Sequence, residues 1–153
     1  MSVSVKLPGF ANSLKEMQKA LEHWKGKKHV TVGIHDGGLP RKDGTLNTAT
    51  IGAINHFGQG RIPARPFLDN GVMSVKTIIA SEASKMMRSG KTPDEILPVV
   101  GNLAVRGVVQ TINNTYTPPN APSTIAKKGS SHPLIDTGNL RQSITFKVND
   151  GRI

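Results

Sequence analysis

Cysteine is absent from the 153 residues, and this absence excludes disulfides, thiolate metal sites and a cysteine nucleophile together. Aromatic residues are scarce, at 4% of the chain. No apolar run approaches the roughly 20 residues that span a bilayer, and the first residues lack the apolar centre of a secretory signal. We therefore expect a chain that folds in a cytoplasm around a thin hydrophobic core, outside any membrane.

Acidic residues are also few: 10 stand against 20 basic residues, which gives a formal net charge of +10. Such an excess favours an anionic partner, either a nucleic acid or an acidic protein surface. The basic residues are dispersed apart from 25–28 and Lys127-Lys128, and no recognised DNA-reading motif accompanies them. The charge alone therefore leaves both kinds of partner open.

The length favours one domain over residues 1–153, and hydrophobic periodicity predicts its elements. Alternating apolar residues predict strands over 2–7, 29–35 and 144–148. Apolar residues at helical spacing predict helices from Ser13 to the residue before Gly26, over 49–57, from Asp69 or Asn70 to about Ser89, and over 92–113, with a helical turn at 140–142. The helix over 49–57 is predicted to carry Ile51, Ile54 and Phe57 on one face and to end at Gly58. The fold class is therefore α+β, a small mainly antiparallel sheet of three or four strands packed against two or three helices.

Three local features qualify these elements. Thr92 and Glu95 form a capping box at the start of the fourth helix, with a proline at its first position. Pro98 either kinks this helix or delays its true start, because it removes a backbone donor. The segments 36–47 and 117–132 are rich in Gly, Pro, Ser and Lys and are predicted to be flexible loops.

Residues with catalytic potential are present but lack the spacing that catalysis requires. His35-Asp36 and the pair His132 and Asp136 show no metal-ligand spacing, and no serine lies in a nucleophile elbow. The glycines between Gly33 and Gly44 match no phosphate-binding loop. We predict no catalytic, cofactor-binding or metal-ligating residue, and a chain that is not an enzyme.

The segment Arg61–Leu68 is unusual because it combines two prolines, two arginines and a Phe-Leu pair. Pro63 and Pro66 remove two backbone donors, so the segment is neither a central strand nor a helix interior. It is predicted to be a stiff, extended arm that makes a specific contact. Two alternatives stay open for its apolar end: Phe67 and Leu68 anchor the arm on a partner, or they fill this chain's own core.

A second notable segment, Asp136–Arg141, has the features of a capped turn before a strand. Asp136 or Thr137 can cap the turn, and Gly138 permits a close approach or an unusual backbone dihedral. Leu140 supplies an apolar anchor. By itself this pattern is typical of an ordinary structural turn.

Three segments together resemble the tailed-bacteriophage virion-morphogenesis proteins, the group of small tail-completion and head–tail joining (neck) components. The segments are Ile51–Gly58, Ile62–Leu68 and Pro133–Ile144, and Val30–Ile34 fits the family's strand that ends in Val-Gly-Ile. The resemblance spans about residues 30–148. One departure is that the family usually has His-Glu-Phe-Gly where this chain has Asn55-His56-Phe57-Gly58.

The resemblance implies a structural virion protein that forms a homo-oligomeric ring, often hexameric or dodecameric, with DNA passing through its centre. Its implied partners are copies of itself, the tail-tube protein and the head connector, and its implied location is the tail or neck of a virion made in a bacterial cytoplasm. The residues expected at the subunit interface are Arg61, Pro63, Arg65, Pro66, Phe67 and Leu68. Arg65 would pair with an acidic group of a neighbour or support the fold. A basic nucleic-acid-binding module is the alternative function.

Overall fold

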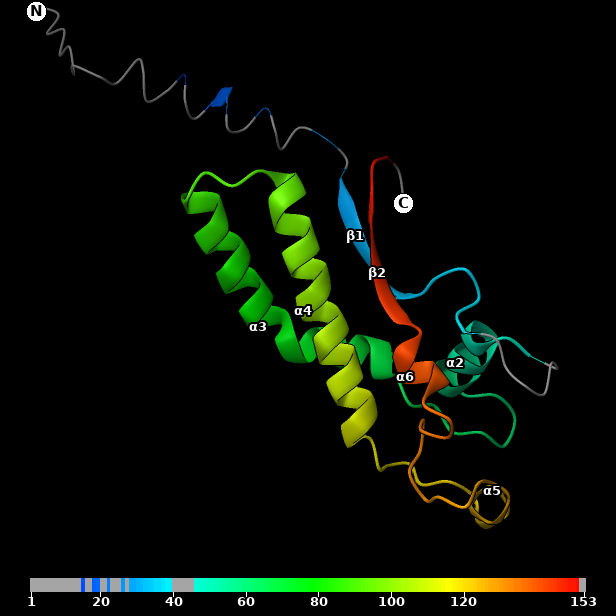
Figure 1. The fold of residues 1–153 in the computed structure, drawn as a ribbon. Helices are drawn as coiled ribbons and strands as arrows, with labels where there is room; N and C mark the ends of the chain where they lie inside the picture. The colour runs from blue at the N-terminus through cyan, green and yellow to red at the C-terminus, as the bar shows by residue number, and fades with distance from the viewer. Residues whose placement is uncertain are drawn as a thin grey trace, which may run out of the picture.

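The computed structural model describes residues 28–39 and 46–151, together with Lys15, Gln18, Lys19, Glu22 and Gly26. The predicted strand over 2–7 lies outside these residues, as does most of the first predicted helix. The described elements follow one another in the order β1 (His29–Ile34), α2 (Thr48–Phe57), α3 (Phe67–Arg88), α4 (Pro93–Asn114), α5 (Pro122–Lys128), α6 (Asn139–Gln142) and β2 (Ile144–Asn149). Helices with a small antiparallel sheet confirm the predicted α+β class (Figure 1). Within the described residues, no helix has the length and apolarity to cross a bilayer.

β1 and β2 form a two-stranded antiparallel ribbon, although they stand at opposite ends of the described chain. The register pairs His29 with Asn149 and Ile34 with Ile144. Alternation then sends Val32, Ile34 and Ile144 to the core side of the ribbon. The two strands were predicted separately; their pairing joins the start of the described chain to its end.

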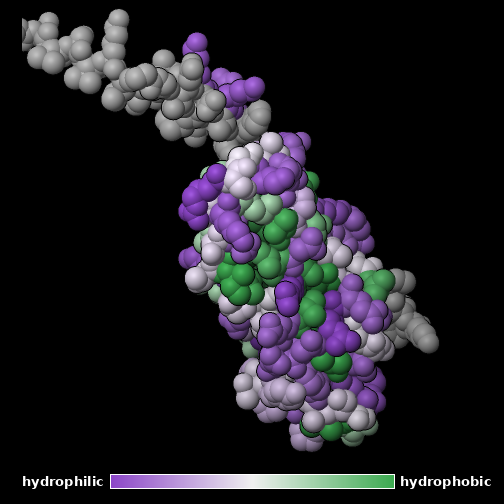
Figure 2. Space-filling model, turned by 60° about the vertical axis from the view of Figure 1, so that its left-hand side comes forward, coloured by the Kyte–Doolittle hydropathy of each residue, from purple (hydrophilic) through white to green (hydrophobic). Residues whose placement is uncertain are grey.

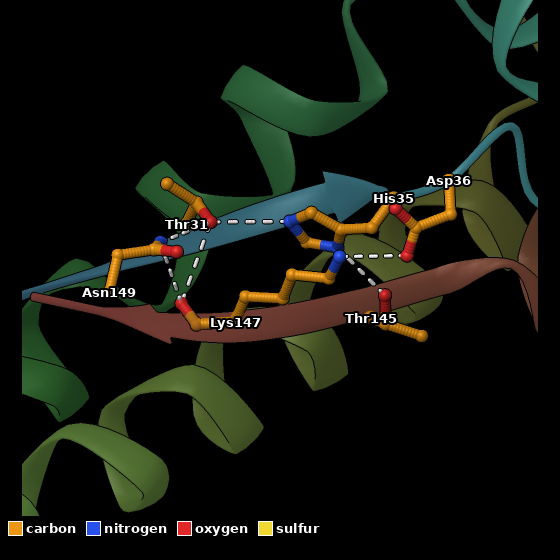
Figure 3. A network of polar contacts seen from close by, with 6 residues as sticks. All are labelled: Thr31, His35, Asp36, Thr145, Lys147 and Asn149. Carbon is orange, nitrogen blue, oxygen red and sulfur yellow. Dashed lines mark hydrogen bonds and ion pairs between the residues drawn. The ribbon is translucent and has the colours of Figure 1, made fainter.

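The other side of the ribbon is polar and carries a connected set of exposed side chains (Figure 3). The two ring nitrogens of His35 lie 3.2 Å from Thr31 Oγ1 and 2.9 Å from Thr145 Oγ1. Lys147 Nζ lies 2.7 Å from Asp36 Oδ2, and the hydrogen bond from this ammonium lowers the pKa of Asp36. His35 and Asp36, considered above as a metal pair, therefore contact hydroxyl and ammonium groups.

α4 is the central layer of the molecule, between the ribbon and α3 (Figure 1). On the ribbon side, a β-carbon at Gly101 would lie 2.4 Å from the Phe146 ring, so the helix backbone rests on that ring. On the other side, Gly107 meets the backbone of α3. The layers share one core cluster of buried residues, formed by Phe67, Val108, Ile112, Leu140 and Ile144.

The start of α4 confirms the predicted capping box. Glu95 Oε2 accepts a hydrogen bond of 2.9 Å from the Thr92 backbone N–H, and Pro93 occupies the first helical turn. Pro98 lies inside a helix that is continuous from Pro93, so the predicted delay of the helix start is wrong. A proline this close to the N-terminus removes only one of the early helical hydrogen bonds, which the rest of a 22-residue helix can tolerate.

α3 begins earlier than predicted. Its first residue is Phe67, and the N-cap is Pro66, so neither Asp69 nor Asn70 caps it. The carbonyl of Pro66 already accepts the Asn70 N–H at 3.0 Å. Asp69 instead lies in the first turn, where the positive end of the helix dipole favours a carboxylate. The proline segment therefore runs directly into the long helix.

Candidate assembly site around the proline segment

The proline segment starts with a tight hairpin. The backbones of Gln59 and Ile62 exchange two hydrogen bonds, of 3.0 and 2.9 Å, around Gly60 and Arg61. Gly60 has a φ of +58°, a conformation that glycine adopts without steric cost. This geometry places the exposed Arg61 at the tip of the turn. We call residues 57–64 the hairpin.

Arg65 lies inside the fold, at 4% exposure, and not on a free surface. Its Nε and Nη2 donate hydrogen bonds of 2.8 and 3.0 Å to the carbonyls of Pro118 and Pro119. Its backbone N–H donates to the Asn55 carbonyl at 2.7 Å, and Nη1 lies 3.4 Å from Asn55 Oδ1. Burial lowers the pKa of the guanidinium from its ordinary value. Of the two predicted roles for Arg65, the geometry matches support of its own fold.

Phe67 is also an internal residue, at 1% exposure, and belongs to the central core cluster. Its ring meets the buried His56 ring edge-on, with centroids 5.4 Å apart. Leu68 is half-buried and packs against the same cluster. In this conformation Phe67 offers no exposed surface to a partner, because its side chain is enclosed by the chain itself. The alternative expectation, that the Phe-Leu pair fills this chain's own core, matches the geometry.

The exposed apolar groups of the region belong to the hairpin. Phe57 is 76% exposed and Ile62 is 44% exposed. Between them, Gly58 lies so close to the Ile62 carbonyl and the Ala64 backbone that a β-carbon there would be about 3 Å from both. Pro63, Ala64 and Pro66 are exposed as well, but offer smaller side chains. The hairpin therefore exposes the aromatic ring of Phe57 and the branched aliphatic side chain of Ile62 on a backbone that prolines make stiff.

The exposure of Phe57 corrects the predicted orientation of α2. Helical spacing grouped Phe57 with Ile51 and Ile54 on one face, but the two isoleucines are half-buried and Phe57 is not. The buried positions of α2 are Thr48, Gly52 and His56. A glycine and two polar residues contribute little to an apolar pattern. The apolar periodicity therefore identified a face of the helix that is rotated away from the face buried in the core.

The 117–132 segment is held in place at several points, and it contains the helix α5 (Pro122–Lys128). Besides the two bonds from Arg65, the Asn120 amide lies 3.3 Å from the carbonyls of Ser131 and His132. The His132 ring lies 2.9 Å from the Asn113 carbonyl. Lys128 Nζ donates to the His132 carbonyl. The sequence predicted a flexible loop here; instead, a seven-residue helix begins at Pro122 and ends at the left-handed C-cap Gly129.

The Asp136–Arg141 segment is a turn before β2, as predicted, but with a different cap. Gly138 is the N-cap of α6, with a φ of +84°, and Thr137 Oγ1 accepts only a long 3.4 Å bond from the Asn139 N–H. Leu140 is buried in the core, as expected of an anchor. Arg141 Nη1 donates to Asn113 Oδ1 at 3.0 Å, which ties the turn to the end of α4.

These separate segments meet around one cavity of about 240 Å³. Asn55 reaches it from α2, Asn120 and Lys128 from the 117–132 segment, and Asp136 and Gly138 from the turn. Burial lowers the pKa of Lys128, while the nearby Asp136 carboxylate opposes that shift. The polar lining of the cavity therefore comes from three parts of the chain that are far apart in the sequence: α2, the 117–132 segment and the turn before β2.

Among the described residues, no group of three or more His, Cys, Asp or Glu side chains is placed to hold a metal ion. His56 is buried, with Nε2 at 3.3 Å from Asp69 Oδ2, while its Nδ1 has no partner. His35 lies on the polar side of the ribbon, where its ring contacts Thr31 and Thr145. The structure therefore does not bring His35, Asp36 and His56 together as one set.

Replacing Arg65 tests how the hairpin is held. Arg65→Lys is expected to lower the free energy of unfolding by about 2 kcal/mol, because the flexible lysine chain lacks the rigid planar set of donors with which the guanidinium reaches the two carbonyls. The matched control is Arg61→Lys at the exposed hairpin tip, which should change stability by less than about 0.5 kcal/mol. Urea unfolding followed by circular dichroism measures both. Equal stability of the two variants would contradict the assigned role of Arg65.

Comparisons with protein-family models, with curated proteins and with solved structures found no match to this chain. Its function is therefore inferred from its own residues and their arrangement.

Proposed function

We propose that this chain is a structural component of a bacteriophage virion, which assembles into a homo-oligomeric ring and completes the tail or joins it to the head. The observation that carries this proposal is the hairpin. It exposes Phe57 and Ile62 to solvent. The buried Arg65, which directly follows the hairpin, anchors it through hydrogen bonds to the carbonyls of Pro118 and Pro119. A rigid support with exposed apolar side chains loses little entropy when it docks, which favours a contact between subunits.

The motif resemblance supports the same proposal from a second direction. Of the segments that resemble the virion-morphogenesis proteins, Ile51–Gly58 and Pro133–Ile144 contribute residues to the cavity lining, and Ile62–Leu68 contacts the first of them through Arg65 and Asn55. Arg65, Phe67 and Leu140 of these segments are interior residues. In the proposed assembly they build the support, and the contact itself is made by the hairpin residues Phe57, Arg61 and Ile62.

A hairpin that docks on a different surface of the next copy makes a heterologous contact, and repeated heterologous contacts close into a ring when the rotation allows it. The excess of basic residues suits a ring with DNA in its lumen. The proposed further partners are the tail-tube protein and the head connector, and the proposed location is the tail or neck of the virion.

The proposal predicts that Phe57→Ser and Ile62→Ser each abolish ring formation without changing the melting temperature by more than a few degrees. Both side chains are exposed, so the fold loses few internal contacts while the subunit contact loses its apolar centre. Light scattering coupled to size exclusion measures the mass, and negative-stain images show the ring. The matched control is Leu46→Ser, an exposed leucine at the opposite end of α2.

Two outcomes would count against the ring. One is a wild-type chain that stays monomeric at every concentration, alone and with the tail-tube protein. The other is equal assembly by all three serine variants. A monomer that instead binds DNA with an affinity falling steeply with salt would favour the nucleic-acid-binding alternative. Lys127 is exposed and available for that contact, whereas Lys128 is tied to the His132 carbonyl.

A further inference from the structure

α3 is the outermost layer of the molecule and carries a second exposed apolar surface. Its inner side packs on α4 through Gly71 and Val75. On the outer side, Met73 is 62% exposed, Met87 is 49% exposed and Ala80 between them is exposed as well. In Figure 2, which brings the α3 side of Figure 1 toward the viewer, apolar residues lie among the polar ones on this face.

The three exposed residues are spaced by seven, so they form one narrow stripe along the helix. A seven-residue spacing is close to two helical turns and keeps side chains on the same side over this length. We call Met73, Ala80 and Met87 the α3 stripe. Its ends are long and adaptable thioether side chains, and its centre is a small methyl group. A partner helix can therefore approach closely at Ala80, while the two methionine side chains pack against it at the ends of the stripe.

The stripe is symmetric about Ala80, because Met73 and Met87 lie equally far from it along the chain. An identical helix that runs in the opposite direction would place each Met73 on the partner's Met87 and each Ala80 on its own copy. A parallel copy would instead stack identical residues on each other along the whole stripe. The small centre and the bulky ends fit either arrangement, so the charges decide the direction.

The charges at the two ends of α3 have opposite signs. Asp69 is exposed in the first turn, next to His56, while Lys85 and Arg88 lie in the last turn; Lys91, just beyond the helix, pairs with Glu95. An antiparallel copy would bring the carboxylate of one chain to the basic end of the other, and it would align the helix dipoles favourably. A parallel copy would oppose like charges at both ends.

We infer that α3 binds α3 of a second copy of this chain, antiparallel, with a two-fold axis at Ala80. The occupant of the stripe is therefore the same stripe on another molecule. One pair of helices buries a small area, so the dimer forms in proportion to concentration and is not permanent. This contact uses a different surface from the hairpin, and it does not depend on the proposed function. Where both contacts form, two rings would pair through their α3 helices.

The absence of cysteine makes the test direct, because a single introduced cysteine can link only to its own copy. Ala80→Cys is expected to give a disulfide-linked dimer under mild oxidation, since the two Cα atoms at the axis come within disulfide reach. Met73→Cys and Met87→Cys should each stay largely unlinked alone, because identical positions lie about 21 Å apart along antiparallel helices. A mixture of these two variants should link.

The matched control is Ser81→Cys, which is exposed on the same helix but about 100° around it from the stripe. Non-reducing electrophoresis measures the linked fraction, and circular dichroism checks that each variant is folded. Ala80→Cys should link several-fold more than Ser81→Cys, and adding Met73→Asp to it should reduce the link to the control level.

The inference is overturned when Ala80→Cys links no more than Ser81→Cys, or when Met73→Cys alone links as well as the mixture, which would indicate parallel helices. Neither result bears on ring formation through the hairpin. That contact is tested separately by the serine variants, in which the α3 stripe is unchanged.

Discussion

Phe67→Ala is expected to lower the free energy of unfolding by about 3–5 kcal/mol, the range for removing a fully buried phenylalanine ring. The ring is enclosed by the core cluster and meets His56 edge-on. Neighbours that belong to three layers cannot all move in to fill the space, so a cavity remains. Assembly would be lost as well, but as a consequence of unfolding.

The matched control is Phe57→Ala, which removes the same ring from an exposed position. It is expected to change stability by less than about 0.5 kcal/mol. Urea unfolding of the two variants, followed by circular dichroism, measures the difference. A folded Phe67→Ala protein of wild-type stability that fails to assemble would show that Phe67 is a contact residue, and it would contradict the core assignment.

The second large effect is expected at the crossing of α3 and α4. Gly71→Ala should destabilise the protein by about 3 kcal/mol or more, at the upper end of the range for overpacking. A β-carbon at Gly71 would lie 2.4 Å from Val108 Cα and 2.8 Å from its backbone nitrogen. These atoms are backbone and cannot rotate away as a side chain can. The two helices would have to separate, which would loosen the core cluster between them.

The same crossing is tight from the other side, since a β-carbon at Gly107 would lie 2.4 Å from the Gly71 carbonyl oxygen. The control for Gly71→Ala is Gly33→Ala in β1, where nothing lies within 4 Å of the added atom. That variant should be neutral or slightly stabilising, because alanine restricts the unfolded chain more than glycine does. Thermal unfolding compares the two. Similar melting temperatures would mean that the helices do not cross through their glycines.

Prediction from sequence succeeded where local chemistry decides the outcome. The capping box at Thr92 and Glu95 and the stop of α2 at Gly58 depend on residues that are neighbours in the chain. It was less accurate at Pro66, where a helix began two residues before the first side chain able to cap it. There the rest of the fold stabilises the first turn, because Phe67 is buried in the core.

The candidate site was predicted in part. The sequence identified residues 61–68 as a stiff, unusual segment, but it left open whether Arg65 and Phe67 contact a neighbour or support the fold, and the structure places both in the interior. Helical spacing placed Phe57 on one face with Ile51 and Ile54, yet it is the most exposed large apolar side chain of the hairpin. No pattern in the neighbouring residues distinguishes two phenylalanines ten positions apart, since their burial depends on which distant elements pack against them.

The sequence by itself determined most of the segments that become helices and strands, with α5 the exception, together with the α+β class and the stiffness of the proline segment, because backbone dihedrals, caps and periodicity are local properties. Only the tertiary structure decided that β1 pairs with β2, that Arg65 binds the carbonyls of Pro118 and Pro119, and that Phe57 is left in solvent. Each of these depends on groups tens of residues apart. Such contacts form only when the whole chain packs, because the free energy of burial that stabilises them is gained only when the complete core is assembled.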